Sequence, residues 1–266
     1  MTESIVPDPD EHLTTGWEPD LPADDTLVRQ AVLAHASWPL AVASALGRPV
    51  RRTPRWAGGR LGDHGDLTNP VLLLQPLDDP AEVLAEIGAL IPAHVPYVLI
   101  SAWPTPDLTP AGLTLLGHPP LMARFPAPPP ASSRPGVEVR EVTDAEDLAT
   151  AEWVLIEGYP MPTMRTGEVF GPGLLGGATR VWLGRVDGEP AAVAVGHVSA
   201  GVTLVEYVAA LPVARGRGVG AAVTWAATLA APEQPAVLLA SDDGRPVYER
   251  MGYVAVERWT AWLRRP

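Results

Sequence analysis

The sequence predicts an α/β (α+β) protein, with a mixed, mostly antiparallel twisted sheet flanked by helices and a smaller N-terminal α/β domain. Three observations support this fold class. Between residues 180 and 208, three apolar segments follow one another across short turns, a pattern typical of antiparallel hairpins. Helix-capping signals occur before and after these segments. The 266 residues, 47% of them hydrophobic, are enough for one or two domains with a sizeable core.

The composition excludes several kinds of chemistry. There is no cysteine, which rules out disulfides, thiolate metal sites and a cysteine nucleophile. The formal net charge of −12 argues against nucleic-acid and membrane partners. No apolar run approaches the roughly 18–20 residues that span a bilayer, and the acidic N-terminus does not resemble a secretory signal. We therefore expect a cytoplasmic protein.

Composition also divides the chain into regions. Residues 1–25 hold eight acidic and no basic residues, which predicts a flexible acidic tail. Ten prolines fall between residues 104 and 135, and the segment 126–135 is typical of a linker. We therefore predict an N-terminal α/β domain over 26–125 and a second domain over 136–266.

The N-terminal domain is expected to alternate helices with short buried strands. Pro39 should kink or split its first helix, and Asp79 followed by Pro80 fits the start of its second helix. The elements expected here are a helix over 27–46, a strand over 71–74, a helix over 80–91, a strand over 97–100, a helical turn over 113–117 and a strand over 121–125.

The second domain has stronger signals. Residues 137–142 alternate with period two, and Asp144 or Thr143 can cap the helix that follows. The remaining elements expected are a helix towards residue 157, strands over 180–186, 191–198 and 202–208, a helix from 218, a strand over 236–240, a helix over 244–251 and one or two strands over 253–263.

A glycine-rich turn leads from the third of these central strands into the next helix. It reads Arg215-Gly216-Arg217-Gly218-Val219-Gly220. Glycines let the backbone approach a ligand, and the first amides of a helix lack intrahelical acceptors, so the turn favours an anion such as a diphosphate. The two arginines can add charge-assisted hydrogen bonds. The alternative is a plain strand–helix turn with surface arginines.

Two other nucleotide-binding patterns fit this turn poorly. A Walker P-loop needs a lysine, and the chain has none. A Rossmann fingerprint belongs to a parallel β-α-β series, whereas the strands before this turn should be antiparallel and nothing after Ala240 continues such a series.

The turn resembles the Arg/Gln-x-x-Gly-x-Gly/Ala pattern of the GNAT acyltransferase superfamily. About 30 residues downstream, Val247-Tyr248-Glu249-Arg250-Met251-Gly252-Tyr253 is similar to that family's Leu-Tyr-x-x-x-Gly-Phe segment. The order of strand, helix and three antiparallel strands upstream is also similar. The resemblance covers residues 136–266. The N-terminal half has a weaker version of the same pattern without a glycine loop, so it is expected to be either a degenerate GNAT-like domain or another small α/β domain, without a cofactor of its own.

The resemblance implies acetyl-CoA as the acyl donor. In this family the loop amides hold the CoA diphosphate, and the splayed strand before the loop binds the pantetheine arm. The residues assigned to acetyl-CoA in this way are Val208, Ala209, Ala210, Arg215, Gly216, Arg217, Gly218, Val219 and Gly220. Whether the donor carries acetyl or a longer acyl chain stays open.

The implied reaction is N-acetylation, in which a primary amine attacks acetyl-CoA directly in a ternary complex. Glu206, on the strand leading into the loop, is the candidate base that deprotonates the amine. Tyr248 is the candidate that protonates the departing thiolate. The alternatives are a solvent-facing or ion-paired Glu206 and a merely packed Tyr248. For the whole chain, the alternative is a noncatalytic acyl-CoA-binding sensor or interaction module that keeps the GNAT fold.

The acceptor is the least determined part of the prediction. The loop after the first helix of the second domain points to Glu157 and Tyr159 as acceptor-binding residues, and the acceptor is either a small-molecule amine or a protein amino group. The six histidines are scattered without a metal-binding spacing, so no metal is expected. Strand edges in the final hairpin would allow a homodimer.

Overall fold

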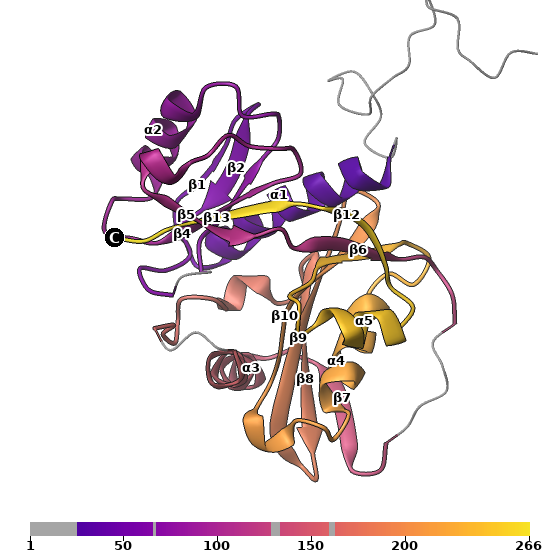
Figure 1. Ribbon diagram of the computed structural model, residues 1–266. Helices are drawn as coiled ribbons and strands as arrows, with labels where there is room; N and C mark the ends of the chain where they lie inside the picture. Colours follow the sequence, from indigo (N-terminus) through magenta and orange to yellow (C-terminus); the bar gives the residue numbers. More distant parts are fainter. Residues whose placement is uncertain (1–25, 66–67, 129–133, 160–162) are drawn as a thin grey trace, which may run out of the picture.

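The computed structural model describes residues 26–65, 68–128, 134–159 and 163–266 (Figure 1). The predicted acidic tail and residues 129–133 of the predicted linker lie outside the described residues. Within the described part of the chain, no helix is both long and apolar enough to cross a membrane.

The N-terminal half contains two helices and six strands among its described residues. They are α1 (Leu27–Ala45), β1 (Val50–Arg52), β2 (Trp56–Gly59), β3 (Pro70–Leu73), α2 (Pro80–Leu90), β4 (Tyr97–Ser101), β5 (Leu113–Gly117) and β6 (Pro120–Arg124). The side chains of Thr26 and Asp79 cap the two helices by accepting hydrogen bonds from the amides of Arg29 and Glu82.

Three expectations for this half need correction. Helix α1 runs as one element through Pro39, because Gly59 of β2 packs closely against it there and tertiary packing outweighs the lost hydrogen bond. Residues 113–117 form strand β5 rather than a helical turn, because they pair with a strand from the far end of the chain. Strands β1 and β2 were not predicted, since their short segment lacks clear alternation.

The second half follows the predicted order. Its elements are β7 (Val137–Glu141), α3 (Ala145–Gly158), β8 (Thr179–Val186), β9 (Glu189–Ser199), β10 (Val202–Ala210), α4 (Val219–Thr228), β11 (Ala236–Leu239), α5 (Arg245–Arg250), β12 (Val254–Arg258) and β13 (Thr260–Arg264). Asp144 caps α3 through the amides of Glu146 and Asp147. Helices α3 and α4 cover opposite faces of the sheet that contains β8, β9 and β10 (Figure 1).

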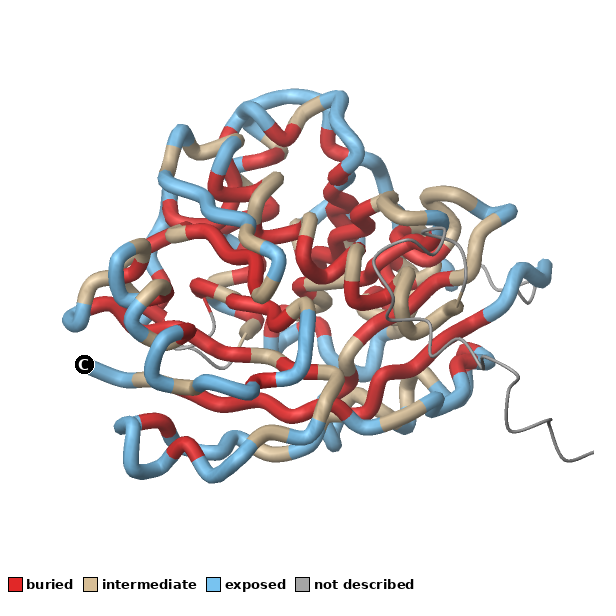
Figure 2. Tube along the Cα trace, turned by 90° about the horizontal axis from the view of Figure 1, so that it is seen from above, coloured by how far each residue is buried: buried red, intermediate tan, exposed pale blue. Residues whose placement is uncertain are grey.

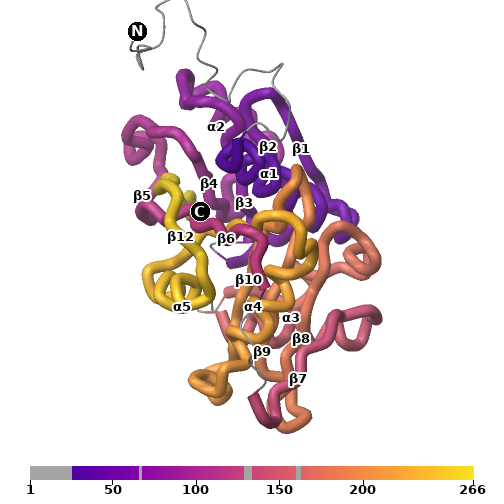
Figure 3. The backbone as a smooth tube through the Cα atoms, turned by 90° about the vertical axis from the view of Figure 1, so that its right-hand side faces the viewer, coloured from indigo at the N-terminus to yellow at the C-terminus, as the bar shows by residue number. Residues whose placement is uncertain are grey.

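The two halves exchange strands. The first sheet has the order β1-β2-β3-β4-β13-β5, and the second has the order β12-β6-β11-β10-β9-β8-β7. Strand β6 of the N-terminal half therefore lies inside the second sheet, and the C-terminal strand β13 lies inside the first. The expected final hairpin does not form, because Trp259 separates β12 and β13 and each joins a different sheet. Figure 3 shows the yellow C-terminal segment beside the magenta and purple strands of the first half.

Helix α1 lies between the halves and joins their cores. It packs on β2 and β3 on one side and on β9 and β10 on the other. Ser37 of α1 contacts His197 of β9, with 2.6 Å between Oγ and Nε2, while Thr179 Oγ1 lies 2.8 Å from His197 Nδ1. One cluster of buried residues contains members of α1, β2, β3, β9 and β10. Figure 2 shows the buried segments in red at the centre of the molecule. The domain boundary at 126–135 stays a prediction. The two halves that it would divide each contribute a strand to the sheet of the other half.

Candidate functional site

Strands β10 and β11 separate part-way along their length. Their parallel pairing consists of Thr203 with Ala236 and Leu204 with Val237, although β10 continues to Ala210 and β11 to Leu239. A β-bulge begins at this point of β10, between Glu206 and Ala209, where the pairing with β9 shifts register. The opening between the two strands therefore starts at Glu206.

Tyr207 occupies the bulge in a left-handed conformation, with φ of 49°. Such a backbone costs a non-glycine residue on the order of 1–2 kcal/mol. Packing holds it in place, because the Tyr207 ring meets Trp38 of α1 edge-to-face at 5.4 Å between centroids. Tyr207 is buried, and both it and its neighbour Glu206 line the cavity described below.

The predicted diphosphate loop lies directly after β10. Gly216 and Gly218 adopt φ values of 77° and 86°, which a residue with a side chain would resist. Gly218 is the N-cap of α4 and no side chain bonds to the first amides of this helix. The first amides of a helix lie at its positive end, an arrangement that favours an anion.

The two loop arginines have different surroundings. Arg215 donates from Nη2 to the carbonyl of Gly158, at 3.2 Å, and from Nε to that of Ala210, at 3.3 Å. It thereby ties the end of α3 to the end of β10. Arg217 forms an exposed ion pair with Asp187, at 2.6 Å. Arg134, from the segment before β7, lies over Gly218.

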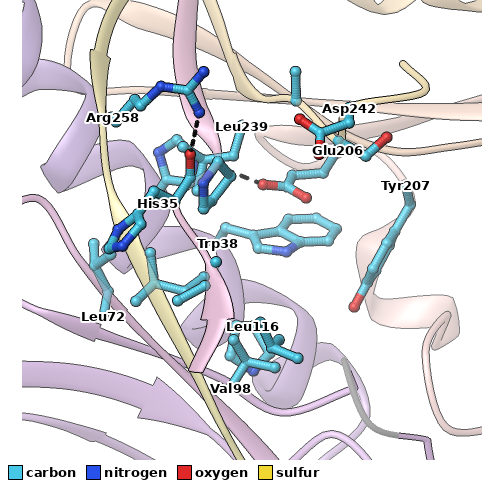
Figure 4. Close-up of a pocket in the computed structure, with 18 of the residues that line it drawn as sticks. His35, Trp38, Leu72, Val98, Leu116, Glu206, Tyr207, Leu239, Asp242 and Arg258 are labelled. Atoms are coloured by element: carbon cyan, nitrogen blue, oxygen red, sulfur yellow. Dashed lines mark hydrogen bonds and ion pairs between the residues drawn. The ribbon is translucent and has the colours of Figure 1, made fainter. Parts of the chain in front are cut away.

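A cavity of about 450 Å³ opens between the halves beside Glu206 (Figure 4). Its walls are apolar and come mainly from the N-terminal half, whereas the polar groups gather at its ends. The lining residues are His35, Trp38, Pro70, Leu72, Val98, Ile100, Leu116, Gly117, His118 and Pro119 from the first half and Tyr159, Glu206, Tyr207, Leu239, Ala240, Ser241, Asp242, Arg258 and Ala261 from the second.

Glu206 is a largely buried carboxylate at the cavity. Its side chain keeps 24% of its surface exposed, towards the cavity, but most of its hydration is lost. This burial raises the pKa of Glu206 to about 7, with a hydrogen bond to the backbone of Tyr207 acting in the opposite direction. A carboxylate with a pKa near neutrality can both accept and release a proton under ordinary conditions.

His35 of α1 lines the cavity next to Glu206, with 3.7 Å between Nε2 of His35 and Oε1 of Glu206 (Figure 4). Its Nδ1 lies 2.8 Å from the carbonyl oxygen of Ala31, and its ring packs on Trp259 at 4.8 Å between centroids. Burial lowers the pKa of His35 to about 4, so the ring is neutral at pH 7. Sequence reasoning did not find His35, since a lone histidine in an alanine-rich helix gives no sign of a partner 171 positions away.

Of the other predicted catalytic and acceptor-binding residues, Tyr159 lines the cavity with Glu206, whereas Tyr248 and Glu157 do not. Tyr159 lines the cavity, and burial together with the Glu206 charge raises its pKa to about 12. Tyr248 of α5 is half-buried against Tyr253, and burial followed by the charges of Tyr159, Tyr253 and Glu206 raises its pKa above the ordinary value. Glu157 is exposed and does not line the cavity, so the geometry gives it no contact with this site.

Metal ligands do not gather in the part of the chain that the structure describes: no three or more His, Asp or Glu side chains are grouped there. His197, a second buried histidine, has both ring nitrogens against hydroxyl groups and does not line the cavity. It serves the packing between the halves.

Comparison with known proteins identifies the fold. No protein-family model matches the chain, and no curated protein matches its sequence. Its structure is similar to a GCN5-related N-acetyltransferase from Kribbella flavida, with 25% identity, a TM-score of 0.60 and coverage of 86% of this chain and 95% of that one.

Two further solved structures agree. A GCN5-related N-acetyltransferase from Sphaerobacter thermophilus has 15% identity, a TM-score of 0.53 and coverage of 89% of this chain and 94% of that one. A GCN5-related N-acetyltransferase-like protein from Streptococcus suis has 13% identity, a TM-score of 0.55 and coverage of 89% and 99%. These shares exceed what residues 136–266 alone can supply, so the similarity extends into the N-terminal half. The chain therefore has the fold of the GNAT superfamily, and its similarity to the Kribbella flavida structure supports an acyltransferase.

Proposed function

We propose that the protein is an N-acetyltransferase that moves an acetyl group from acetyl-CoA to a primary amine by direct attack in a ternary complex. The observation that carries this proposal is the position of Glu206. Its carboxylate lines the cavity where β10 and β11 separate, on the strand that leads into the loop at 215–220. Glu206, the opening between β10 and β11, and the proposed anion-binding loop therefore follow one another along a short stretch of the chain.

Acetyl-CoA would be held by the same elements. The amides that begin α4 and Arg217 would contact the diphosphate, and the segment Val208, Ala209 and Ala210 would lie along the pantetheine arm, on the edge of β10 that faces away from β9. The open edge of β10 supports this assignment, since β11 has already turned away there. The thioester would then lie beside Glu206.

The chemistry follows from these positions. An ammonium group has no lone pair, so Glu206 first takes a proton from the acceptor. The amine nitrogen then forms a bond to the thioester carbonyl carbon, the carbon–sulfur bond breaks, and the nitrogen releases its second proton, which balances the proton that the thiolate takes up. The departing thiolate needs a proton, and Tyr248 is the residue proposed to assist. Its raised pKa keeps it protonated at neutral pH but also makes it a weak acid, so we expect its contribution to be modest.

The cavity walls suggest the kind of acceptor. Trp38, Leu72, Val98 and Ile100 offer an apolar surface, and Glu206 provides a negative charge at one end. We propose a primary amine carried on an apolar body, because such a molecule satisfies both features. Tyr159 would contact this acceptor, whereas Glu157 lies away from it.

Calorimetry with acetyl-CoA, using desulfo-CoA and ATP as controls, tests the first part of the proposal. Release of free thiol is then followed with 2-phenylethylamine, spermidine and glycine as acceptors. We expect acetyl-CoA to bind and 2-phenylethylamine to give the fastest release. Binding without thiol release from any amine would favour a noncatalytic acyl-CoA-binding module, and absence of binding would overturn the donor assignment.

A further inference from the structure

The Glu206 carboxyl has a neighbour that the proposed reaction does not yet use. His35 is 5% exposed, and its Nε2 is buried with no hydrogen-bond partner among the described residues. An unpaired buried acceptor is costly, at roughly 1–3 kcal/mol, and it calls for an explanation at this position. Among the described residues, the carboxylate that lies against it is that of Glu206, 3.7 Å away.

The tautomer of His35 follows from its contacts. Nδ1 lies 2.8 Å from the carbonyl oxygen of Ala31, which can only accept, so Nδ1 carries the proton. Because burial keeps the ring neutral, Nε2 is an unprotonated acceptor. The ring packs against Trp259 in a tilted arrangement, with 56° between the ring planes, and this contact together with the Nδ1 hydrogen bond fixes the direction of Nε2.

The relation between the two groups depends on the state of Glu206. An ionised carboxylate and an unprotonated Nε2 are both acceptors and cannot bond. A protonated carboxyl has one O–H donor, which needs an acceptor at about 2.8 Å. A movement of roughly 1 Å brings Oε1 to that distance, and the Glu206 side chain has room to move because it borders the cavity.

We propose that His35 is a positioning residue for the base: its Nε2 accepts a hydrogen bond from the Glu206 carboxyl after that group has taken the proton of the acceptor amine. The proton moves from the amine nitrogen to Glu206 and stays there, so His35 is never charged. The residue thereby makes Glu206 a stronger base, and it links α1 of the N-terminal half to the chemistry of β10. This role rests on the proposed function, but the contact itself can be measured without it.

Nuclear magnetic resonance of the full-length, ¹⁵N-labelled protein without ligands tests the contact. The side-chain nitrogens of His35 are followed between pH 8.5 and 5.5. We expect Nδ1 to stay protonated throughout, and the Nε2 resonance to move towards the hydrogen-bonded position with a midpoint near the pKa of Glu206. Glu206→Leu should abolish this change. His197, with both nitrogens against hydroxyls, is the internal control that should not respond near pH 7.

Other ionisable groups must be separated from this effect. Those that line the cavity or act on Glu206 are Tyr159, Tyr207, Tyr248, His118, Asp242 and Arg258. The three tyrosines have raised pKa values and stay neutral in this range. His118 has its own resonance, and the Glu206→Leu comparison removes the contributions of the rest.

A kinetic experiment tests the consequence for the base. His35→Asn keeps a donor near Ala31 but lacks an acceptor at the Nε2 position, whereas His35→Gln places an amide oxygen near it. We expect the inflection in kcat/KM for 2-phenylethylamine to move about one pH unit towards acid in His35→Asn and to return in His35→Gln. The affinity for acetyl-CoA should not change, and His197→Asn should leave the inflection in place even if it lowers the melting temperature.

The outcomes separate this proposal from the proposed function. If Nε2 does not respond near pH 7, if the response survives Glu206→Leu, or if the ring itself becomes protonated there, the role of His35 is overturned even in an active enzyme. If Nε2 responds as expected and no amine is acetylated, the contact stands and the acetyltransferase assignment fails.

Discussion

The loop at 215–220 and the cavity beside Glu206 are built in opposite ways. The loop is one continuous segment whose shape depends on its own backbone: two glycines with positive φ and the first amides of α4. The cavity is assembled from residues of both halves, and Glu206, its proposed base, has a neighbour from α1. A site made from contiguous residues can be read as a motif, whereas a site made by packing has no local pattern to read.

The first prediction tests whether the two sites are separable. Gly218→Trp should lower the affinity for acetyl-CoA by about 100-fold or more, because φ of 86° is unfavourable for tryptophan and a Cβ at this position would collide with Arg134. Binding of 2-phenylethylamine in the cavity should not change. Calorimetry measures both affinities.

Gly112→Trp is the matched control for this experiment. Gly112 also has a positive φ, of 81°, but it lies in the N-terminal half with open space around it, so acetyl-CoA should bind normally. A folded Gly218→Trp variant that binds acetyl-CoA as the wild type does would contradict the role of the loop.

The second prediction concerns the cavity alone. Glu206→Gln keeps the shape of the side chain but cannot accept a proton, so turnover should fall by about 100-fold while acetyl-CoA affinity is retained. In the wild type, kcat/KM should rise with pH through about 7 as Glu206 ionises, and Glu206→Gln should lack this inflection. Steady-state thiol release across pH 5.5–8.5 measures both effects.

Glu233→Gln provides the comparison, since Glu233 is an exposed carboxylate before β11 and outside the cavity. Its profile should match the wild type. Full activity in Glu206→Gln would exclude Glu206 as the base.

The third prediction is that the ionised carboxylate of Glu206 lowers the free energy of unfolding. The pKa of Glu206 is raised on folding, so its ionisation opposes folding and stability is lost as the pH rises through about 7. Glu206→Gln should therefore be more stable than the wild type at pH 8.5, by about 1–3 kcal/mol in the free energy of unfolding. Urea unfolding at several pH values measures this difference, which should narrow towards pH 5. An equal stability at pH 8.5 would show that Glu206 is well solvated.

The smallest effect is expected for the residue proposed to protonate the departing thiolate, Tyr248. Tyr248→Phe should reduce kcat by at most about tenfold and leave acetyl-CoA affinity unchanged, because a tyrosine with a raised pKa is a weak acid. Pre-steady-state thiol release measures this step. Unaltered turnover in Tyr248→Phe would leave the residue with a packing role against Tyr253.

Local patterns were the most reliable guide to the fold. Asp79 and Asp144 cap helices as expected, and the strands from β7 to β11 follow the predicted order, because caps and alternation act over a few residues. The prediction was wrong for residues 113–117, whose strand exists only because β13 pairs with it. No window of the sequence contains both strands of that pair.

The fold class, the loop at 215–220 and the choice of Glu206 as candidate base could be predicted from the amino-acid sequence, since each depends on residue types close together in the chain. Three features needed the folded chain: β6 and β13 each lie in the sheet of the other half, an apolar cavity opens between the halves, and His35 faces Glu206. Burial provides the physical reason: a carboxylate becomes a base poised near neutrality when packing from both halves removes its water, and that packing joins residues far apart in the chain.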